Sequence, residues 1–382
     1  MIIQSKRVWL GENFVPAQIQ VENGLIEAVL RYGEKPVDCD MGNERLLPGF
    51  IDIHTHGSYG FDTNDGTPGG LRDWMLRITE EGVTAILPTT VTQFPDVLIK
   101  ALSNVASVVE EGYEGAEILG VHLEGPFIDT TKKGAQPEKA IAKPSVSQFK
   151  LYQDAAKGLI KYITLSPEHD DGYALTSFCA KNGVTVSIGH SIASYDEALF
   201  AIANGASSMT HVYNGMTGLH HRDIGLVGTA LSLHELYGEI IGDGMHVTKE
   251  MVKLFFDQKG KDHGIMITDS LRAKHCEPGG VYDLGGQEIE IDERGLARIK
   301  GTDTIAGSTL SMNKGLRFLV EEAKVDEVTA INAVTINPAR ALKVDSRKGR
   351  IRANYDADIV ALSDEYDVLC TWCRGKKFSK QK

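Results

Sequence analysis

The chain has 382 residues, enough for one large domain with a smaller companion and a well-buried core. Lysine and arginine number 40 against 52 aspartates and glutamates, and this net charge of −12 argues against a nucleic-acid-binding surface. No apolar stretch approaches the roughly 20 residues that span a bilayer, and the N-terminus lacks a signal pattern, so we expect a cytoplasmic protein without a membrane partner.

The cysteines are few and scattered. Their number, 5, is odd, which is typical of reduced thiols rather than of a disulfide framework. Cys370 and Cys373 form a single C-x-x-C in a segment typical of a strand, with no second pair elsewhere. We interpret this pair as structural, with a zinc or redox role as the minor alternative.

Both ends of the chain consist of short segments typical of strands. The expected strands cover residues 2–10, 18–22 and 25–31 at one end and 349–351, 358–362 and 368–373 at the other. Neither set is large enough for a sheet of its own. We therefore predict that the two ends pair into one small β-sandwich domain, built from residues 1–45 and 345–382.

The middle of the chain alternates strands with helices. Strands are expected at 49–53, 84–87, 118–123, 162–165, 184–188, 208–211, 239–242 and 264–268. Helices are expected at about 70–81, 95–111, 144–158, 173–182, 194–204, 224–233 and 248–260. This alternation predicts an α/β fold, a (β/α)8 barrel of the TIM type over residues 46–344, and a doubly wound open sheet is the alternative. A β excursion at 281–300 and helices at 309–322 and 326–335 follow.

In a barrel of this kind, catalytic groups lie at the C-terminal ends of the strands. Histidines and carboxylates dominate these ends: Asp52, His54, His56, Glu124, Glu168, His190, His211, Asp243, His246 and Asp269. Glu124 closes an apolar strand, where an ionised carboxylate is costly unless it is paired or bound to a metal. A satisfied salt bridge is the simpler explanation, and a metal site requires matching ligands on other strands.

Such ligands are present. His54 and His56 are two residues apart, so an extended strand directs both side chains the same way. Glu124, His190 and His211 add one carboxylate and two imidazoles, the donor set of a catalytic zinc-type site with an open position for water. A single histidine would more often be a hydrogen-bonded core residue, but this concentration at one face of the barrel favours a metal.

Asp269 is the candidate general base and acid. A carboxylate whose ordinary pKa is about 3.9 is ionised at neutral pH and can accept a proton from an activated water. A structural aspartate is the alternative, and a further metal ligand is a role compatible with the first.

Loops after the later strands carry candidate substrate contacts. Asn214, Gly215, Arg222 and His246 stand on the loops that follow the sixth and seventh strands. Arg222 lies in a locally cationic segment suited to phosphate or carboxylate, although an exposed ion pair with Asp223 is an equal alternative. The backbone of Ala306, Gly307 and Ser308 precedes a helix and is placed either to cap it or to hold a polar group. No glycine-rich nucleotide-binding loop is present.

Several motifs of the chain resemble those of a known family. Residues 48–56 are similar to the first-strand signature of the amidohydrolase superfamily. More narrowly, the segments 122–127, 132–135, 189–191, 210–216 and 243–246 resemble the N-acetylglucosamine-6-phosphate deacetylase family. The similarity extends from about residue 45 to Arg340.

The resemblance implies metal-dependent hydrolysis of the acetamide of a phosphosugar, N-acetyl-D-glucosamine 6-phosphate, in amino sugar catabolism and cell-wall sugar recycling. It implies that Glu124, His190 and His211 hold the metal and that Asp269 is the catalytic acid and base. It assigns the sugar-phosphate site to Ala135, Gln136, Asn214, Gly215, Arg222, His246, Ala306, Gly307 and Ser308. In the family this arginine enters the neighbouring subunit's site, which implies a homodimer.

The chain departs from the family pattern at three places. Some members have Gln-x-Asn at the positions of His54 and His56 and bind one metal, so both histidines here imply one or two divalent ions per subunit, with zinc or iron expected first and manganese or cobalt as alternatives. Gln136 replaces a histidine that polarises the carbonyl in some members, which shifts that role to the metal and His246. Ser270 and Leu271 follow Asp269 where Ala-Thr or Ala-Met is commoner.

Two other functions are alternatives for this chain. A cyclic-amide hydrolase on the same barrel commonly bridges two metals with a carboxylated lysine, whereas Glu124 fills that role here. A barrel that serves only as an assembly module is expected to lack ligands, and none of the expected ligands is missing from this chain.

Overall fold

The computed structural model describes residues 1–277 and 279–379, so the last three residues of the predicted small domain lie outside the described residues. The barrel strands follow one another in chain order: β6 (Phe50–Thr55), β9 (Val83–Thr90), β11 (Val121–Glu124), β12 (Ile160–Leu165), β13 (Thr185–Ile188), β14 (Ala206–Met209), β15 (Tyr237–Ile241) and β16 (Gly264–Ile267). All neighbouring pairs from β6 to β16 are parallel. The predicted barrel is therefore confirmed, and the open-sheet alternative is wrong.

Side chains and backbone together close the barrel between its first and last strands. The backbone N–H of Asp269, just after β16, donates to the carbonyl of His54 on β6 at 2.9 Å. One residue earlier, the hydroxyl of Thr268 donates to the buried carboxylate of Asp52 at 2.6 Å. These bonds join the two strand ends that carry the first and last candidate ligands.

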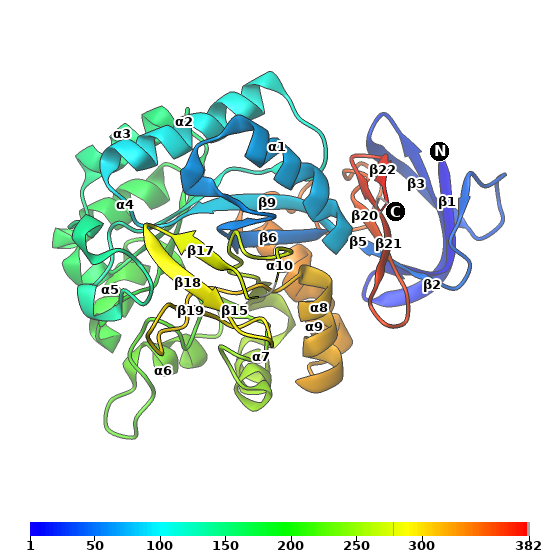
Figure 1. Cartoon of the computed structure of the whole chain (residues 1–382). Coiled ribbons are helices and arrows are strands. Elements are labelled where there is room, and N and C mark those ends of the chain that lie inside the picture. Colours follow the sequence, from blue (N-terminus) through cyan, green and yellow to red (C-terminus); the bar gives the residue numbers. More distant parts are fainter. Residues whose placement is uncertain (278, 380–382) are drawn as a thin grey trace.

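Helices cover the outside of the barrel (Figure 1). They are α1 (Pro68–Arg77), α2 (Pro95–Glu111), α3 (Val146–Ala155), α4 (Ala174–Lys181), α5 (Tyr195–Ala203), α6 (Gly225–Ser232), α7 (Lys249–His263), α8 (Met312–Arg317), α9 (Glu327–Val334) and α10 (Ile336–Ala341). A π-helical turn, Phe318–Glu322, follows α8. In the described residues no helix is both long and apolar enough to cross a membrane.

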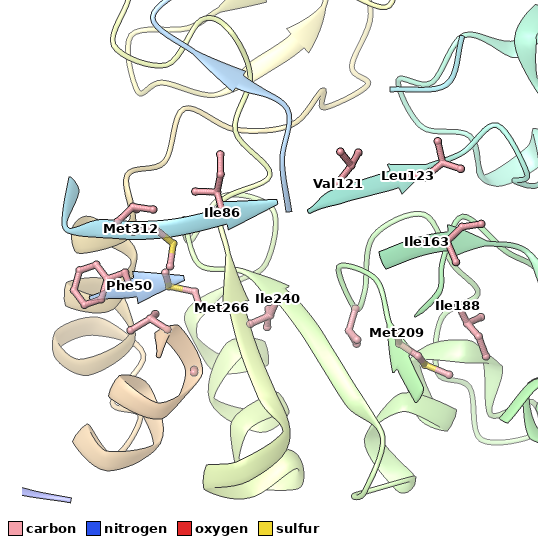
Figure 2. Packing of buried hydrophobic residues seen from close by; sticks show 14 of the residues in the cluster. Phe50, Ile86, Val121, Leu123, Ile163, Ile188, Met209, Ile240, Met266 and Met312 are labelled. Carbon is pink, nitrogen blue, oxygen red and sulfur yellow. The ribbon is translucent and has the colours of Figure 1, made fainter. Parts of the chain in front are cut away.

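The period of two along each strand produces two separate cores. Phe50, Ile86, Ile240 and their counterparts on the other strands point outward and pack under the helices (Figure 2). Their immediate neighbours Ile51 and Ile241 point inward and fill the barrel below the strand ends. Apolar side chains therefore fill most of the barrel interior, and polar side chains occupy the end where the strands stop.

The two chain ends form a separate sheet beside the barrel (Figure 1). Its strands run in the order β22 (Lys376–Phe378), β21 (Val368–Cys373), β20 (Ile359–Leu362), β5 (Arg45–Pro48), β1 (Ile2–Leu10), β2 (Asn13–Glu22) and β3 (Leu25–Arg31), with β4 (Cys39–Asp40) paired to β1. Its inward residues enclose a core of their own around Trp372 and Ile19. The expected pairing of both chain ends is confirmed, while the domain boundaries remain a prediction.

A few elements differ from their predicted bounds. The strand expected at 118–123 is interrupted at Gly120, whose φ of 155° breaks the ladder, into β10 (Glu117–Ile118) and β11. After the break, β11 ends at Glu124. The β excursion after the barrel is confirmed as a three-stranded sheet of β17 (Val281–Leu284), β18 (Gln287–Ile291) and β19 (Ala297–Ile299).

Candidate metal centre and active site

The candidate ligands converge at one end of the barrel because each stands where a strand stops. His54 is the last residue but one of β6, and Glu124 is the last residue of β11. His190, His211 and Asp269 follow β13, β14 and β16 with φ values of 48°, 26° and 49°. These left-handed conformations are rare for residues other than glycine, and such strain is characteristic of functional sites. The backbone thus turns out of each strand at its ligand.

The first group of ligands contains Glu124, His190 and His211. The Oε1 atom of Glu124 lies 3.2 Å from the Nε2 atom of each histidine, and the two Nε2 atoms are 3.1 Å apart. All three side chains are buried. One carboxylate and two imidazoles are therefore close enough to bind a single ion.

The second group contains His54, His56 and Asp269. The Oδ1 atom of Asp269 lies 3.1 Å from Nε2 of His56 and 3.6 Å from Nε2 of His54. Glu124 also faces this group. Its Oε1 atom lies 3.3 Å from Nε2 of His54, and its Oε2 atom lies 3.3 Å from Nε2 of His56. Glu124 therefore faces the histidines of both groups and would contribute to holding an ion in either one.

Hydrogen bonds on the far side of the rings show that these residues fit a metal. Three of the rings face a backbone carbonyl through Nδ1: His190 faces Lys132 at 2.7 Å, His211 faces Asn214 at 3.2 Å, and His56 faces Thr89 at 3.2 Å. The Nδ1 atom of His54 instead faces a carboxylate oxygen of Glu239 at 2.9 Å. Carbonyl and carboxylate oxygens only accept, so each Nδ1 carries the hydrogen and a neutral ring presents the lone pair of Nε2 to the centre. Lone pairs and carboxylates that face one another require a cation, and this outer bonding is that of metal-ligating histidines.

The pKa shifts of the site also favour a cation between these groups. Burial disfavours the charged form of His56, yet hydrogen bonds and charge from Asp269 and Glu124 raise its pKa to about 10. Burial would raise the pKa of Glu124, but His54, His190 and His211 hold that pKa well below its usual range. Both effects mean that positive charge between these groups is strongly stabilised.

A pocket opens above the ligands and contains most of the expected substrate contacts. The following residues line it: His56, Val91, Glu124, Gly134, Ala135, Gln136, His190, His211, Asn214, Gly215, Ile241, His246, Asp269, Leu271, Leu284, Ile305 and Gly307. No lysine or arginine of the described chain is among them. The pocket of one chain therefore offers amides, histidines and apolar side chains, but no strong cation for a phosphate.

Two polar side chains of the pocket have fixed orientations. The Nε2 atom of Gln136 donates to Glu124 at 2.6 Å, while its Oε1 atom accepts from the backbone N–H of Thr92 at 2.7 Å. His246 donates through Nδ1 to Asp243 at 2.6 Å, and the backbone N–H of His246 also bonds this carboxylate. Burial opposes the charged form of His246, but Asp243 raises its pKa.

Three expected substrate residues do not line this pocket: Ala306, Ser308 and Arg222. Ala306 is fully buried in the apolar cluster under the β17–β19 sheet. Ser308 is buried, and its hydroxyl donates to the carbonyl of Thr268. Of the predicted trio, only Gly307 lines the pocket, and its φ is 54°.

Arg222 is exposed on the long segment between β14 and α6, which projects away from the barrel (Figure 1). Its Nη1 atom lies 2.7 Å from Nε2 of His221. No ion pair joins Arg222 to Asp223, both of which are described, and the Asp223 carboxylate accepts from the backbone N–H of Gly225. The loop instead folds back through backbone bonds between His220 and Asp223.

The sequence did not single out Glu239, and it placed Asp243 at a strand end without giving it a role. Glu239 is fully buried within β15 and contacts His54, and Asp243 orients His246. A carboxylate in the apolar strand Tyr237–Ile241 is a signal of the kind that singled out Glu124. Glu168, by contrast, bonds Ser191 and the backbone N–H of Ile192 and does not line the pocket.

Comparisons with known proteins agree with this geometry. Residues 45–378 match the amidohydrolase family. The chain is 42% identical over 335 residues to an N-acetylglucosamine-6-phosphate deacetylase of Bacillus subtilis (strain 168), with 86% of this chain and 83% of the relative covered. It is 32% identical to an N-acetylgalactosamine-6-phosphate deacetylase of Escherichia coli O157:H7, with 96% and 95% covered.

A solved structure is similar over the whole chain. It is a variant of the N-acetyl-D-glucosamine-6-phosphate deacetylase of Mycobacterium smegmatis in complex with N-acetyl-D-glucosamine 6-phosphate. The TM-score is 0.93 at 28% identity, with 99% of this chain and 98% of that chain covered. The resemblance inferred from the motifs is thereby confirmed. The chain belongs to the amidohydrolase family, among its N-acetylglucosamine-6-phosphate deacetylases.

Proposed function

We propose that this enzyme hydrolyses the acetamide of N-acetyl-D-glucosamine 6-phosphate to D-glucosamine 6-phosphate and acetate, as a step of amino sugar catabolism and cell-wall sugar recycling. The observation that supports this proposal most directly is the convergence of four imidazole Nε2 atoms on Glu124 at the floor of the pocket. The Bacillus relative and the Mycobacterium structure, both named for this reaction, support the choice of substrate.

A divalent metal belongs to this chemistry. Glu124, His190 and His211 would hold one ion, and His54, His56 and Asp269 would hold another, so we propose two ions per subunit, with zinc or iron ahead of manganese and cobalt. When bound, such an ion polarises a carbonyl oxygen and lowers the pKa of water from 15.7 to about 7.

The chain's own residues then carry the proton and orient the amide. Burial would raise the pKa of Asp269, but His54 and His56 lower it, so the carboxylate is ionised and accepts a proton from the attacking water. Asp269 returns that proton to the departing amine nitrogen. His246 and the amide of Gln136 are placed to donate to the carbonyl oxygen as it gains charge, and one such donor typically contributes about 3–4 kcal/mol.

The substrate assignment is tested by acetate release. Purified enzyme is supplied with N-acetylglucosamine, its 6-phosphate and N-acetylgalactosamine 6-phosphate, since the Escherichia relative is named for the last sugar. We expect the highest kcat/KM with N-acetylglucosamine 6-phosphate and at least about 100-fold less without the phosphate, because charge-assisted hydrogen bonds contribute about 1.5–3 kcal/mol each. Equal rates with and without phosphate would remove the phosphosugar from the proposal.

Asp243 is expected to set the alkaline limit of activity through His246. The donor form of His246 is the protonated ring, which is lost as pH rises through its pKa, and Asp243 raises that pKa. An Asp243→Asn variant lowers it, so the alkaline limb of the kcat/KM profile moves to lower pH. A pH–rate profile that keeps its alkaline limb unchanged in this variant would show that His246 does not donate as a cation.

The phosphate is assigned to Arg222 of a neighbouring subunit in a homodimer. The pocket lining of the described chain contains no arginine or lysine, although a phosphate dianion requires a cation. Arg222 projects from the barrel without a carboxylate partner in the described chain, which suits a residue that serves another copy. These two observations support the proposal together.

Mixing two variants that are impaired at different residues tests this arrangement at a low concentration of the phosphorylated sugar. Arg222→Ala is expected to raise KM for the phosphorylated sugar by about 10–100-fold, as loss of one charge-assisted contact does, and to leave unphosphorylated sugar unaffected. Co-refolded Arg222→Ala and Asp269→Asn chains should regain activity, because one site of the mixed dimer then has both Asp269 and its neighbour's Arg222. No regain on mixing would place Arg222 in the site of its own chain.

A cytoplasmic location completes the proposal. A phosphorylated sugar is charged and does not cross membranes unaided, so its hydrolysis belongs to the compartment in which it is made. The five cysteines are all free thiols, as expected of a reducing compartment.

A further inference from the structure

Glu239 lies inside the barrel directly beneath the metal ligands. It occupies the middle of β15, with a relative exposure of 0%. Its Oε2 atom accepts from Nδ1 of His54 at 2.9 Å and from the backbone N–H of His211 at 3.3 Å. Its Oε1 atom has no hydrogen-bond partner in the described chain. A buried carboxylate with this arrangement requires an explanation, because its desolvation is costly.

The contact distinguishes His54 from the other histidines of the site. His56, His190 and His211 are each held by a backbone carbonyl, whereas His54 alone is held by a side-chain carboxylate. Because a carboxylate only accepts, it fixes the hydrogen on Nδ1 and directs the lone pair of Nε2 toward Glu124 and Asp269. A charged acceptor also makes the ring a stronger ligand than a neutral carbonyl does.

The charge of Glu239 has to be balanced through this histidine. No lysine or arginine of the described residues forms an ion pair with Glu239. The nearby His122 does not supply charge: its Nδ1 donates to the carbonyl of Ile53, its Nε2 accepts from Thr164, and burial keeps its pKa well below the usual range. Among the described residues, compensation beyond the backbone N–H of His211 runs through His54 to whatever cation the site holds.

We propose that Glu239 is the positioning residue that makes His54 a metal ligand, and that it thereby determines whether the group of His54, His56 and Asp269 binds its ion. The inference rests on the metal-dependent function proposed above. It adds a residue that contacts neither substrate nor metal and acts through the ring of His54.

Counting bound cobalt tests the proposal without any substrate. Metal-free wild type and Glu239→Gln, which keeps the shape and removes the charge, are titrated with Co²⁺ by equilibrium dialysis. We expect two equivalents in the wild type and a 10–100-fold weaker second equivalent in the variant, the usual cost of removing such an outer partner. Thr164→Val, an isosteric change at the same depth that leaves Glu239 untouched, is the matched control and should bind both equivalents normally.

A double-mutant cycle separates positioning from packing. In a His54→Gln background, Glu239→Gln should cause no further loss of Co²⁺, since the ring through which it acts is gone. If Glu239→Gln does not fold, as judged by thermal unfolding of the metal-free protein, Glu239→Asp gives the same test by retracting the carboxylate and should show the same loss. A wild type that binds one equivalent, a variant that binds two with unchanged affinity, or an equal loss in both backgrounds would overturn the proposal. Acetate release by the wild type is measured separately, so failure of the proposed reaction is distinguishable from failure of this assignment.

Discussion

An Asp269→Asn variant is expected to lose about 10²–10⁴-fold in kcat, the usual contribution of a positioned general base and acid. The asparagine keeps the size of the side chain and one oxygen toward the ligands, but its amide accepts no proton from water. The buried carboxylate, held ionised by His54 and His56, has no substitute in the pocket with the same reach. Metal content should stay near that of the wild type, which is checked by elemental analysis of the same sample.

The matched control is Asp257→Asn on the exposed side of α7, where the aspartate pairs with Lys253. This variant should retain wild-type kcat. If Asp269→Asn turned over at a near-normal rate with its metal bound, another group would have to carry the proton, and the role given to Asp269 would be wrong.

Glu124→Gln is expected to have the other large effect, the loss of both ions rather than of one. Among the described residues, Glu124 alone has a carboxylate that faces the Nε2 atoms of His54, His56, His190 and His211, at distances of 3.2 or 3.3 Å. An amide keeps an oxygen for one side only and removes the negative charge that both groups share. Acetate release should fall to background, and added metal should restore little of it.

Elemental analysis of Glu124→Gln beside Glu235→Gln, a change at an exposed glutamate before β15, measures this effect. The control should keep its full complement of metal. Retention of one full equivalent by Glu124→Gln would mean that the carboxylate serves one ion only, and the bridging position inferred from its distances would be abandoned.

The fold and the convergence of the candidate ligands were predictable because both depend on local pattern. Each barrel strand is a short apolar run with a polar residue where it stops, and in a closed parallel barrel all such stops meet at one end. That single rule places Glu124, His190 and Asp269 together although they are far apart in the sequence. The spacing of His54 and His56 likewise follows from the period of a strand.

The parts that escaped prediction depend on contacts between distant residues. Glu239 stands 185 residues from His54, and only the closure of the barrel brings the two into contact. The orientation of Ser308 depends on a hydrogen bond to Thr268 across two segments, so the sequence alone could not separate it from Gly307. The role proposed for Arg222 requires a second copy of the chain, which no local pattern describes.

The most direct test of the whole account is acetate release from N-acetylglucosamine 6-phosphate by one preparation in three states: as purified, stripped by a chelator, and reloaded with zinc. Glu124, the four histidines and Asp269 leave a metal-free centre with its carboxylates and lone pairs uncompensated. The account predicts activity in the first state, background in the second and recovery in the third, with metal content rising and falling in parallel. Full activity in stripped protein that carries no measurable metal would contradict it.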